Sequence, residues 1–180
     1  MNKSIVLAGG CFWCVEAVFN RVNGVASAIS GYANGDSESA PSYEQVCTGR
    51  TGFAEACRVT FDTEIISLQD ILLIFFTTHN PTTLNRQGAD AGTQYRSGIY
   101  YDNASDVETI HAVIAQVQDE AWYADPIVTE VTLLTHFFEA EAYHQHYFEQ
   151  NPHAGYCQIV INPKIAKLKQ SFAHLLKSEA

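Results

Sequence analysis

This chain of 180 residues lacks any apolar run long enough to cross a membrane. Its most apolar stretch, residues 72–76, is followed closely by the polar segment 79–81, whereas a membrane helix needs about 18 or more apolar residues in succession. The N-terminal residues also lack the charged-then-apolar pattern of a secretion leader. We therefore expect a soluble, cytoplasmic protein.

Positive charge is scarce as well. The chain has 10 Lys and Arg against 20 Asp and Glu, a formal net charge of −10 at pH 7. This charge repels phosphate groups, so neither a nucleic acid nor an anionic membrane is expected as a partner. Repeats and low-complexity segments are absent, and only 17 % of residues are charged. This composition predicts a single globular domain spanning residues 1–180, and nothing in the sequence requires more than a monomer.

The cysteines do not form the even set expected of a secreted disulfide framework. There are five of them, which favours redox or catalytic use, although any one could be a small buried core residue. Cys11 and Cys14 lack a second pair at zinc-finger spacing. His144 and His146, two apart on a predicted helix, would point to different sides. We therefore expect no metal site. The cysteines are Cys11, Cys14, Cys47, Cys57 and Cys157.

The most informative segment that is present is Gly-Gly-Cys-Phe-Trp-Cys, residues 9–14. It follows an apolar run that reads as a buried strand and precedes a helix-like stretch. Cys11 is thus predicted where a Gly-rich turn meets a helix N-terminus, whose partial positive charge favours a thiolate. Phe12 and Trp13 would place apolar surface beside the sulfur. The pattern predicts an enzyme with a cysteine nucleophile.

Periodicity predicts strands and helices in mixed order. Ser67, with Asp70 three residues later, resembles a capping box at the start of a helix. The long connections 33–46 and 79–97 are polar and Gly-containing, and long loops in a compact domain usually carry function. Strands are expected at about 4–9, 25–32, 53–61, 99–101 and 127–134, and helices at about 11–21, 67–78, 104–121, 139–149 and 163–176.

Three further residues outside the Gly-Cys segment could carry chemistry. On a strand at 53–61, Glu55 shares a face with apolar side chains, so burial would raise its pKa and make it a proton donor. It could equally lie at a wet strand end or pair with an arginine. The loop 79–97 could hold Asp90 and Tyr95 near a reacting group, or it could be a solvated surface loop.

Cys157 follows a Pro-containing turn near the end of the chain. An accessible thiol there would be suited to attack an oxidised Cys11 if the fold brings the two together. The alternative is a half-buried thiol without a partner.

These segments resemble the A-type peptide methionine sulfoxide reductases. The resemblance implies an α+β fold, a two-layer α/β sandwich with a ferredoxin-like mixed sheet and helices on one side. It implies thiol-dependent reduction of methionine S-sulfoxide, free and in oxidised proteins, with no bound cofactor. Thioredoxin, or dithiothreitol in vitro, would be the reductant. The matching segments are 10–13, 41–49, 52–55, 85–97 and Gly-Tyr-Cys at 155–157.

The resemblance also implies roles for individual residues. Cys11 would attack the sulfoxide sulfur and Glu55 would protonate its oxygen, which releases methionine and leaves a sulfenic acid. An aromatic pocket would accept the methyl group and reject the oxygen, because burying that oxygen unpaired costs about 2–7 kcal/mol. The other implied roles are hydrogen bonding to the oxygen by Tyr43 and Tyr95, ordering of the site by Asp90, the methyl pocket by Phe12 and Trp13, and resolution by Cys157.

Three positions depart from the family pattern. Cys14 stands where Gly is commoner, so it could resolve the sulfenic acid before or instead of Cys157. Cys157 is favoured, because two thiols three residues apart on a rigid helix turn bond only with strain. Phe53 and Ala89 stand where His and Asn are usual. Neither change removes a proton-transfer group, so we expect an active enzyme.

Two other functions remain open at this point. A thiol–disulfide oxidoreductase of the thioredoxin type would also carry Cys-x-x-Cys after a strand, although no Thr-Pro element facing the motif is evident. A redox-sensing or Met-binding module could use the aromatic pocket without turnover.

Overall fold

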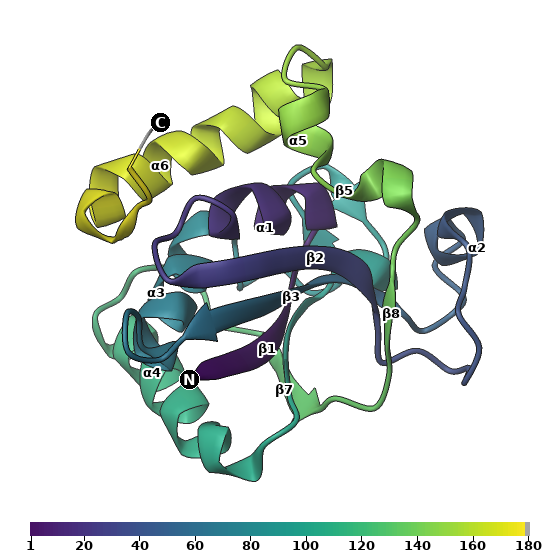
Figure 1. Cartoon of the computed structure of the whole chain (residues 1–180). Helices are drawn as coiled ribbons and strands as arrows, with labels where there is room; N and C mark the ends of the chain where they lie inside the picture. Colours follow the sequence, from purple (N-terminus) through teal and green to yellow (C-terminus); the bar gives the residue numbers. More distant parts are fainter. Residues whose placement is uncertain (179–180) are drawn as a thin grey trace.

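The computed structural model describes residues 1–178 as a six-stranded mixed sheet with helices (Figure 1). The strand order is β7-β6-β1-β3-β2-β8, and a separate two-stranded ladder pairs β4 with β5. Only β6 and β7 run parallel, and the other paired neighbours are antiparallel. The α+β class is therefore confirmed. The strands are β1 (Asn2–Gly9), β2 (Val25–Ala33), β3 (Ala54–Asp62), β4 (Arg86–Gln87), β5 (Asp90–Ala91), β6 (Ser97–Tyr101), β7 (Glu130–Leu133) and β8 (Phe137–Glu139).

The helices follow most of the predicted ranges. The Ser67 hydroxyl accepts the Asp70 N–H at 3.1 Å and caps α3, as its spacing predicts. None of the helices described here combines the length and apolarity needed to cross a membrane. The α-helices are α1 (Phe12–Phe19), α2 (Tyr43–Cys47), α3 (Leu68–Thr78), α4 (Val107–Asp119), α5 (Tyr147–Gln150) and α6 (Asn162–Phe172), and short 3₁₀ turns and one π-helical turn, Cys157–Ile161, join them.

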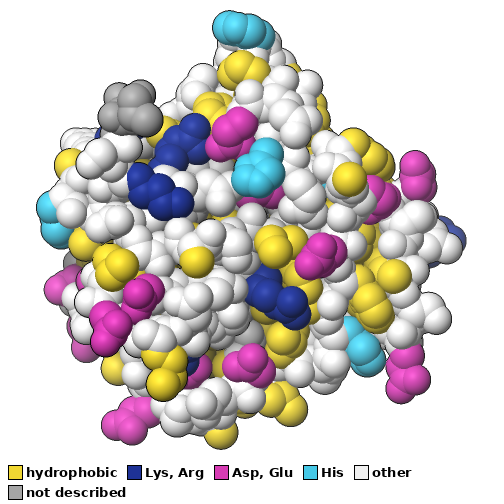
Figure 2. Space-filling model, in the orientation of Figure 1, with side chains coloured by type: hydrophobic (Ala, Val, Ile, Leu, Met, Phe, Trp, Pro, Cys, Tyr) yellow, Lys and Arg dark blue, Asp and Glu magenta, His cyan; other side chains and the backbone are white. Residues whose placement is uncertain are grey.

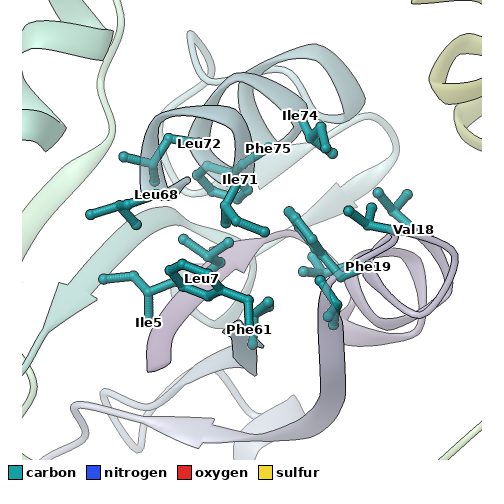
Figure 3. Close-up of a cluster of buried hydrophobic side chains, with 14 of the residues drawn as sticks. Ile5, Leu7, Val18, Phe19, Phe61, Leu68, Ile71, Leu72, Ile74 and Phe75 are labelled. Atoms are coloured by element: carbon teal, nitrogen blue, oxygen red, sulfur yellow. The ribbon is translucent and has the colours of Figure 1, made fainter. Parts of the chain in front are cut away.

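The main hydrophobic core lies between the sheet and the helices α1, α3 and α4. Alternate strand residues point to opposite faces, so Ile5 and Leu7 of β1 and Phe61 of β3 face Phe19 and the apolar side of α3 (Figure 3). The opposite face is lined mainly by small side chains, including Ala8 of β1. The pattern fixes which strand residues can reach the helix side of the sheet.

Two segments differ from the prediction. The expected helix at 139–149 is wrong, because the chain there forms β8, a 3₁₀ turn and the short α5. His146 adopts a left-handed conformation with φ 54°, and the Gln145 side chain bonds the backbone N–H and C=O of Ser30. The loop 33–46 contains the start of α2, which carries a capping box formed by Ser42 and Gln45.

The end of the described chain is fastened to the loop after α1. Val22 and Leu176 form a β-bridge, the Asn23 N–H donates to the Leu175 carbonyl at 2.7 Å, and the Lys177 N–H donates to the Arg21 carbonyl at 2.8 Å. The helix α6 thereby lies across α1 on the side away from the sheet (Figure 1).

Candidate active site

Cys11 lies at the junction of β1 and α1, as the sequence predicts. Gly10 has φ 92°, and a Cβ there would come within 2.6 Å of the Gln87 side chain, so this tight turn requires glycine. Cys11 is the N-cap residue of α1, with an extended ψ of 128°. The Cys14 N–H donates to its carbonyl at 3.1 Å. The turn places the sulfur at the head of the helix.

The prediction that the helix dipole makes Cys11 a thiolate is wrong. Burial raises the pKa of the Cys11 thiol well above its ordinary value, and Cys14 and Glu55 raise it further. The pKa of Cys14 is instead lowered to about 7, chiefly by a side-chain hydrogen bond from Cys11. In this buried pair, desolvation of Cys11 outweighs the partial charge of the helix N-terminus. Cys11 therefore rests as a thiol.

Glu55 on β3 is completely buried beside this junction. Its Oε1 accepts the Phe12 backbone N–H at 3.2 Å, while Oε2 has no hydrogen-bond partner among residues 1–178. Desolvation raises the pKa of Glu55 to about 8, although the Phe12 N–H acts in the opposite direction. Among the described residues, Glu55 therefore neither lies at a solvent-exposed strand end nor pairs with an arginine. Near neutral pH, Glu55 is a protonated acid with one oxygen free for a ligand.

Phe12 and Trp13 form an aromatic wall with residues from the C-terminal part of the chain. Tyr147 stacks on Trp13 with ring centroids 3.7 Å apart and an interplanar angle of 8°. The Trp13 indole N–H donates to His144 Nδ1 at 3.1 Å, and the His144 ring lies 5.1 Å from the Phe12 ring. The orientation of the indole is thus fixed from two sides.

Sequence reasoning missed His144 as a site residue. The Trp13 indole donates to its Nδ1, so the neutral imidazole carries its proton on Nε2, which is buried without a partner among the described residues. Desolvation lowers the pKa of His144, which keeps the ring neutral. A pattern of two histidines on a presumed helix gave no sign of this contact, because the contact joins α1 to a 3₁₀ turn 131 residues later.

Tyr43 and Tyr95 lie on different elements that approach Glu55. Tyr43 opens α2, and its backbone N–H donates to Glu141 at 3.0 Å. Tyr95 lies in the 3₁₀ turn that precedes β6. Desolvation, followed by the charge of Glu55, raises the pKa of both phenols. Both hydroxyls therefore keep their protons and can donate hydrogen bonds.

Asp90 belongs to a polar chain that reaches Cys14. The Tyr156 hydroxyl donates to Asp90 Oδ2 at 2.8 Å, and the Cys14 sulfur lies 3.7 Å from the same hydroxyl oxygen. Tyr156 was not singled out from the sequence, although it lies inside the Gly-Tyr-Cys segment. The ladder of β4 and β5 is thus connected to both α1 and the C-terminal segment.

Cys157 is fully buried, so the prediction of an accessible late thiol is wrong. It opens the π-helical turn and belongs to the same apolar cluster as Cys11 and Cys14. Burial raises its pKa, and Cys14 raises it further. Cys47 alone among the five cysteines is exposed.

One group of side chains has the composition of a metal site. Possible ligand atoms of Glu16, His146 and Glu149 lie within 4.8 Å of one another. Glu16 already accepts the Ser30 hydroxyl at 2.6 Å and the His146 backbone N–H, and Glu149 pairs with Arg21 at 3.1 Å. These contacts explain the group as an internal anchor between α1 and α5.

A family model described as peptide methionine sulfoxide reductase matches residues 3–176. The chain belongs to the peptide methionine sulfoxide reductase family. Peptide methionine sulfoxide reductase MsrA of Pasteurella multocida is 51 % identical over 177 residues, which cover 98 % of this chain and 100 % of that relative. The MsrA of Polynucleobacter asymbioticus is 49 % identical over 170 residues, covering 94 % of this chain and 89 % of the relative.

Solved structures agree with this assignment of the reductase. The reduced form of Mxr1 from Saccharomyces cerevisiae superposes with a TM-score of 0.79 and 37 % identity, over 87 % of this chain and 89 % of that one. Mxr1 in complex with Trx2 superposes with a TM-score of 0.56 and 25 % identity, over 81 % and 84 %. The reaction of this reductase is the reduction of methionine S-sulfoxide to methionine, and neither the thioredoxin-type nor the binding-module alternative is retained.

Proposed function

We propose that Cys11 attacks the sulfoxide sulfur while Glu55 protonates the sulfoxide oxygen. The observation that carries this proposal is the buried Glu55 carboxyl, which is protonated near neutral pH and has a free oxygen beside Cys11. A sulfoxide sulfur is a poor electrophile until its oxygen is protonated or strongly hydrogen-bonded. Tyr43 and Tyr95 supply two further donors to the same oxygen, and both phenols keep their protons.

The reaction balances without an outside acid. The Cys11 sulfur takes the oxygen and becomes a sulfenic acid, while the substrate sulfur gains the electron pair and leaves as methionine. Glu55 gives its proton to the transferred oxygen. The proton of the Cys11 thiol passes to Glu55 and restores its acid form. Both groups hold a proton in the resting enzyme, because the pKa of each is raised.

The substrate is oriented by the aromatic side chains of Phe12 and Trp13. Phe12 and Trp13 accept the methyl group, and the oxygen points toward Glu55. The opposite epimer would turn its oxygen onto apolar rings, where an unpaired polar atom costs about 2–7 kcal/mol. Asp90 orders the site from the other side by accepting the Tyr156 hydroxyl.

Cys157 resolves the oxidised enzyme as a disulfide in this proposal, and thioredoxin reduces it, with dithiothreitol as a substitute in vitro. The complex of the yeast relative with Trx2 supports this reductant. The net charge of −10 disfavours nucleic acid, and on the face drawn in Figure 2 the Lys and Arg side chains occupy small separated areas. Free methionine sulfoxide, oxidised proteins under repair, a monomeric state and a cytoplasmic location remain predictions.

We also propose that the domain is ferredoxin-like and single, spanning residues 1–180. The spatial order β6-β1-β3-β2 and the chain order β1-α1-β2-β3-α3-β6 support that topology. One contiguous apolar core joining the sheet to α1, α3 and α4 supports a single domain.

The test is turnover of the separate S and R epimers of a labelled methionine sulfoxide with dithiothreitol as reductant. We expect reduction of the S epimer alone. Equal reduction of both epimers would contradict the orientation by the aromatic wall. Reduction of insulin disulfides without sulfoxide turnover would contradict the proposed chemistry altogether.

A further inference from the structure

The side chain of Glu141 lies between elements that meet at the active site. Glu141 is partly buried and directly precedes the 3₁₀ turn 142–144. Its Oε1 accepts the hydroxyl of Tyr32 at 2.7 Å, and Tyr32 on β2 is the cross-strand partner of Glu55 on β3. Its Oε2 accepts the backbone N–H of Tyr43, the first residue of α2, at 3.0 Å. One carboxylate therefore joins the sheet to α2.

The backbone of Glu141 holds a third element. Its carbonyl accepts the His144 N–H at 2.9 Å and closes the turn that carries the imidazole. The hydroxyl of the exposed Tyr143 makes only a long contact with Oε2, at 3.4 Å. Glu141 is thus bonded to the residues that carry three aromatic rings of the site, Tyr32, Tyr43 and His144.

These three rings surround Phe12, to which we assign part of the methyl pocket. The centroid of the Phe12 ring lies 5.7 Å from that of Tyr32, 6.4 Å from that of Tyr43 and 5.1 Å from that of His144. The rings of Tyr43 and His144 also pack on each other, with centroids 4.3 Å apart. Close-packed side chains transmit a displacement to their neighbours. The packing around Phe12 therefore depends on the bonds that Glu141 makes.

The helix α2 needs contacts of this kind because it has only five residues. Isolated helices this short are not stable in water, and the helix lies apart from the other helices (Figure 1). Val46 anchors its middle by full burial in the apolar cluster of the site. The Thr93 hydroxyl holds the chain beyond its end by donating to the Gly49 carbonyl at 3.0 Å. The bond from Tyr43 to Glu141 fixes the residue that carries the phenol.

Glu141 is suited to this task because it is ionised. Burial raises the pKa of its carboxyl, but hydrogen bonds from the Tyr32 hydroxyl and from backbone N–H groups, including that of Tyr43, hold the pKa below its ordinary value. A hydrogen bond to a charged acceptor is about twice as strong as one between neutral groups. The start of α2 is therefore attached to the site by a strong bond.

We infer that Glu141 is a positioning residue that places the Tyr43 phenol against the sulfoxide oxygen. This inference rests on the proposed role of Tyr43 as a donor to that oxygen. Without the bond at its backbone N–H, the start of α2 moves, and a hydrogen bond weakens steeply when its length or angle changes. Cys11 and Glu55 keep their positions, but one donor to the oxygen is displaced.

The experiment is a double-mutant cycle with Glu141→Gln and Tyr43→Phe in the full chain. Glutamine keeps the size of the side chain but removes the charge and one acceptor oxygen, whereas phenylalanine removes the hydroxyl and keeps the backbone N–H. The measurements are kcat and KM for methionine S-sulfoxide with dithiothreitol, and urea unfolding. Glu139→Gln is the matched control, because it makes the same exchange at an exposed position two residues earlier.

We expect Glu141→Gln and Tyr43→Phe each to lower kcat/KM about tenfold, mostly through kcat, because a donor to the oxygen acts in the transition state. The double variant should lie within about threefold of Tyr43→Phe, because no hydroxyl remains to be placed. A role in stability alone would lower kcat/KM by the same factor in both backgrounds. Glu139→Gln should behave as the wild type.

Amide hydrogen exchange gives a readout that does not depend on turnover. Exchange of residues 42–47 should become about tenfold faster in Glu141→Gln, while exchange of β3 stays at the wild-type rate. Tyr32→Phe frees Oε1 but keeps the bond to Tyr43, so it should cause a smaller increase. It takes the place of Glu141→Gln in the cycle if that variant does not fold.

Two results would overturn the inference. One is wild-type exchange of residues 42–47 in Glu141→Gln. The other is a double variant whose loss of kcat/KM equals the product of the two single losses. Full activity of Tyr43→Phe would instead refute the proposed role of the phenol, while faster exchange of residues 42–47 would still show that Glu141 attaches α2. The two failures are therefore distinguishable.

Discussion

The two halves of the active site are held by different kinds of interaction. Glu55 lies on β3 and Cys11 at the junction of β1 and α1, and a backbone ladder joins β1 to β3. The C-terminal wall, which we define as His144, Tyr147 and Tyr156, stands on short turns that side-chain contacts attach to α1 and to Asp90. In the proposed mechanism the ladder half carries the reacting groups, and the wall carries the groups that orient them.

This difference predicts which of the two halves tolerates substitutions. A strand register cannot move by one residue without turning every side chain to the other face, so the distance from Cys11 to Glu55 is set by the fold. A wall residue acts through one or two contacts, each worth about 0.5–1.5 kcal/mol. Loss of a ladder residue should abolish a chemical step, whereas loss of a wall residue should weaken it.

The largest effect is expected for Glu55→Gln. The amide cannot protonate the sulfoxide oxygen, so kcat should fall by about 10²–10⁴. Activity of the wild type should decline as the pH rises through about 8, where Glu55 loses its proton, and this decline should vanish in the variant. The measurement is the pH profile of kcat for the S epimer.

The control for Glu55→Gln is alkylation of Cys11 by iodoacetamide, which should proceed on an intact site. If the variant turns over like the wild type at neutral pH, Glu55 is not the acid. A substitution in the ladder half would then cost no more activity than one in the wall.

The second effect concerns stability. The pKa of Glu55 is raised to about 8 in the folded protein from an ordinary value of 4.5. The folded state therefore binds the proton more tightly than the unfolded state, and this stabilisation is complete only below the unfolded pKa. The free energy of unfolding should fall between about pH 4.5 and pH 8, by roughly 4–5 kcal/mol in total.

Urea unfolding of the wild type and of Glu55→Gln across that range measures this effect. The difference between the two proteins should follow the same pH window. Parallel pH dependences would show that the buried carboxyl is accommodated without penalty, contrary to its desolvation.

A smaller effect is expected for His144→Phe in the wall. The phenyl ring keeps the aromatic packing, but the Trp13 indole loses its acceptor. We expect kcat/KM to fall about fivefold, mostly through KM, because one buried hydrogen bond is worth about 1 kcal/mol. Tyr143→Phe is the matched control, since the exposed Tyr143 ring lies 4.1 Å from the same imidazole, tilted by 41°. A loss as large as that of Glu55→Gln would place His144 in the chemistry itself.

The smallest effect is expected outside both halves. Ser67→Ala removes the cap of α3 and should lower the free energy of unfolding by about 1 kcal/mol. Sulfoxide turnover should stay unchanged at 25 °C. Ser171→Ala on the exposed surface of α6 is the control, because no cap depends on it. A change in kcat with Ser67→Ala would contradict the independence of the site from this end of the fold.

The ladder half was predictable because its signals are local. Alternation along 53–61 places Glu55 on the apolar face of its strand, although it leaves a solvent-exposed strand end or an arginine pair open, and a Gly-rich turn before a helix predicts the position of Cys11. The charge state of Cys11 was not predictable, since burial depends on residues from the rest of the chain and here outweighs the helix dipole.

The wall was not predictable for a related reason. A helix was expected at 139–149 because the composition suits one, but Gln145 bonds Ser30 and His146 is left-handed. These contacts join parts of the chain more than 100 residues apart, which no local window contains. His144 therefore became visible as a partner of Trp13 only in the folded chain.

The backbone hydrogen bonds between residues 21–23 and 175–177 have a consequence for the lifetime of the enzyme. Residues 175–177 follow α6 in the chain and attach it to residues 21–23. A carboxypeptidase that removed residues 175–177 would therefore free α6, which begins five residues after Cys157. Such trimming would leave Cys11 at the head of α1 and Glu55 on β3 while loosening Cys157, the thiol proposed to resolve the oxidised enzyme. If Cys157 resolves the enzyme as proposed, the trimmed enzyme would reduce one sulfoxide and then stall in an oxidised form.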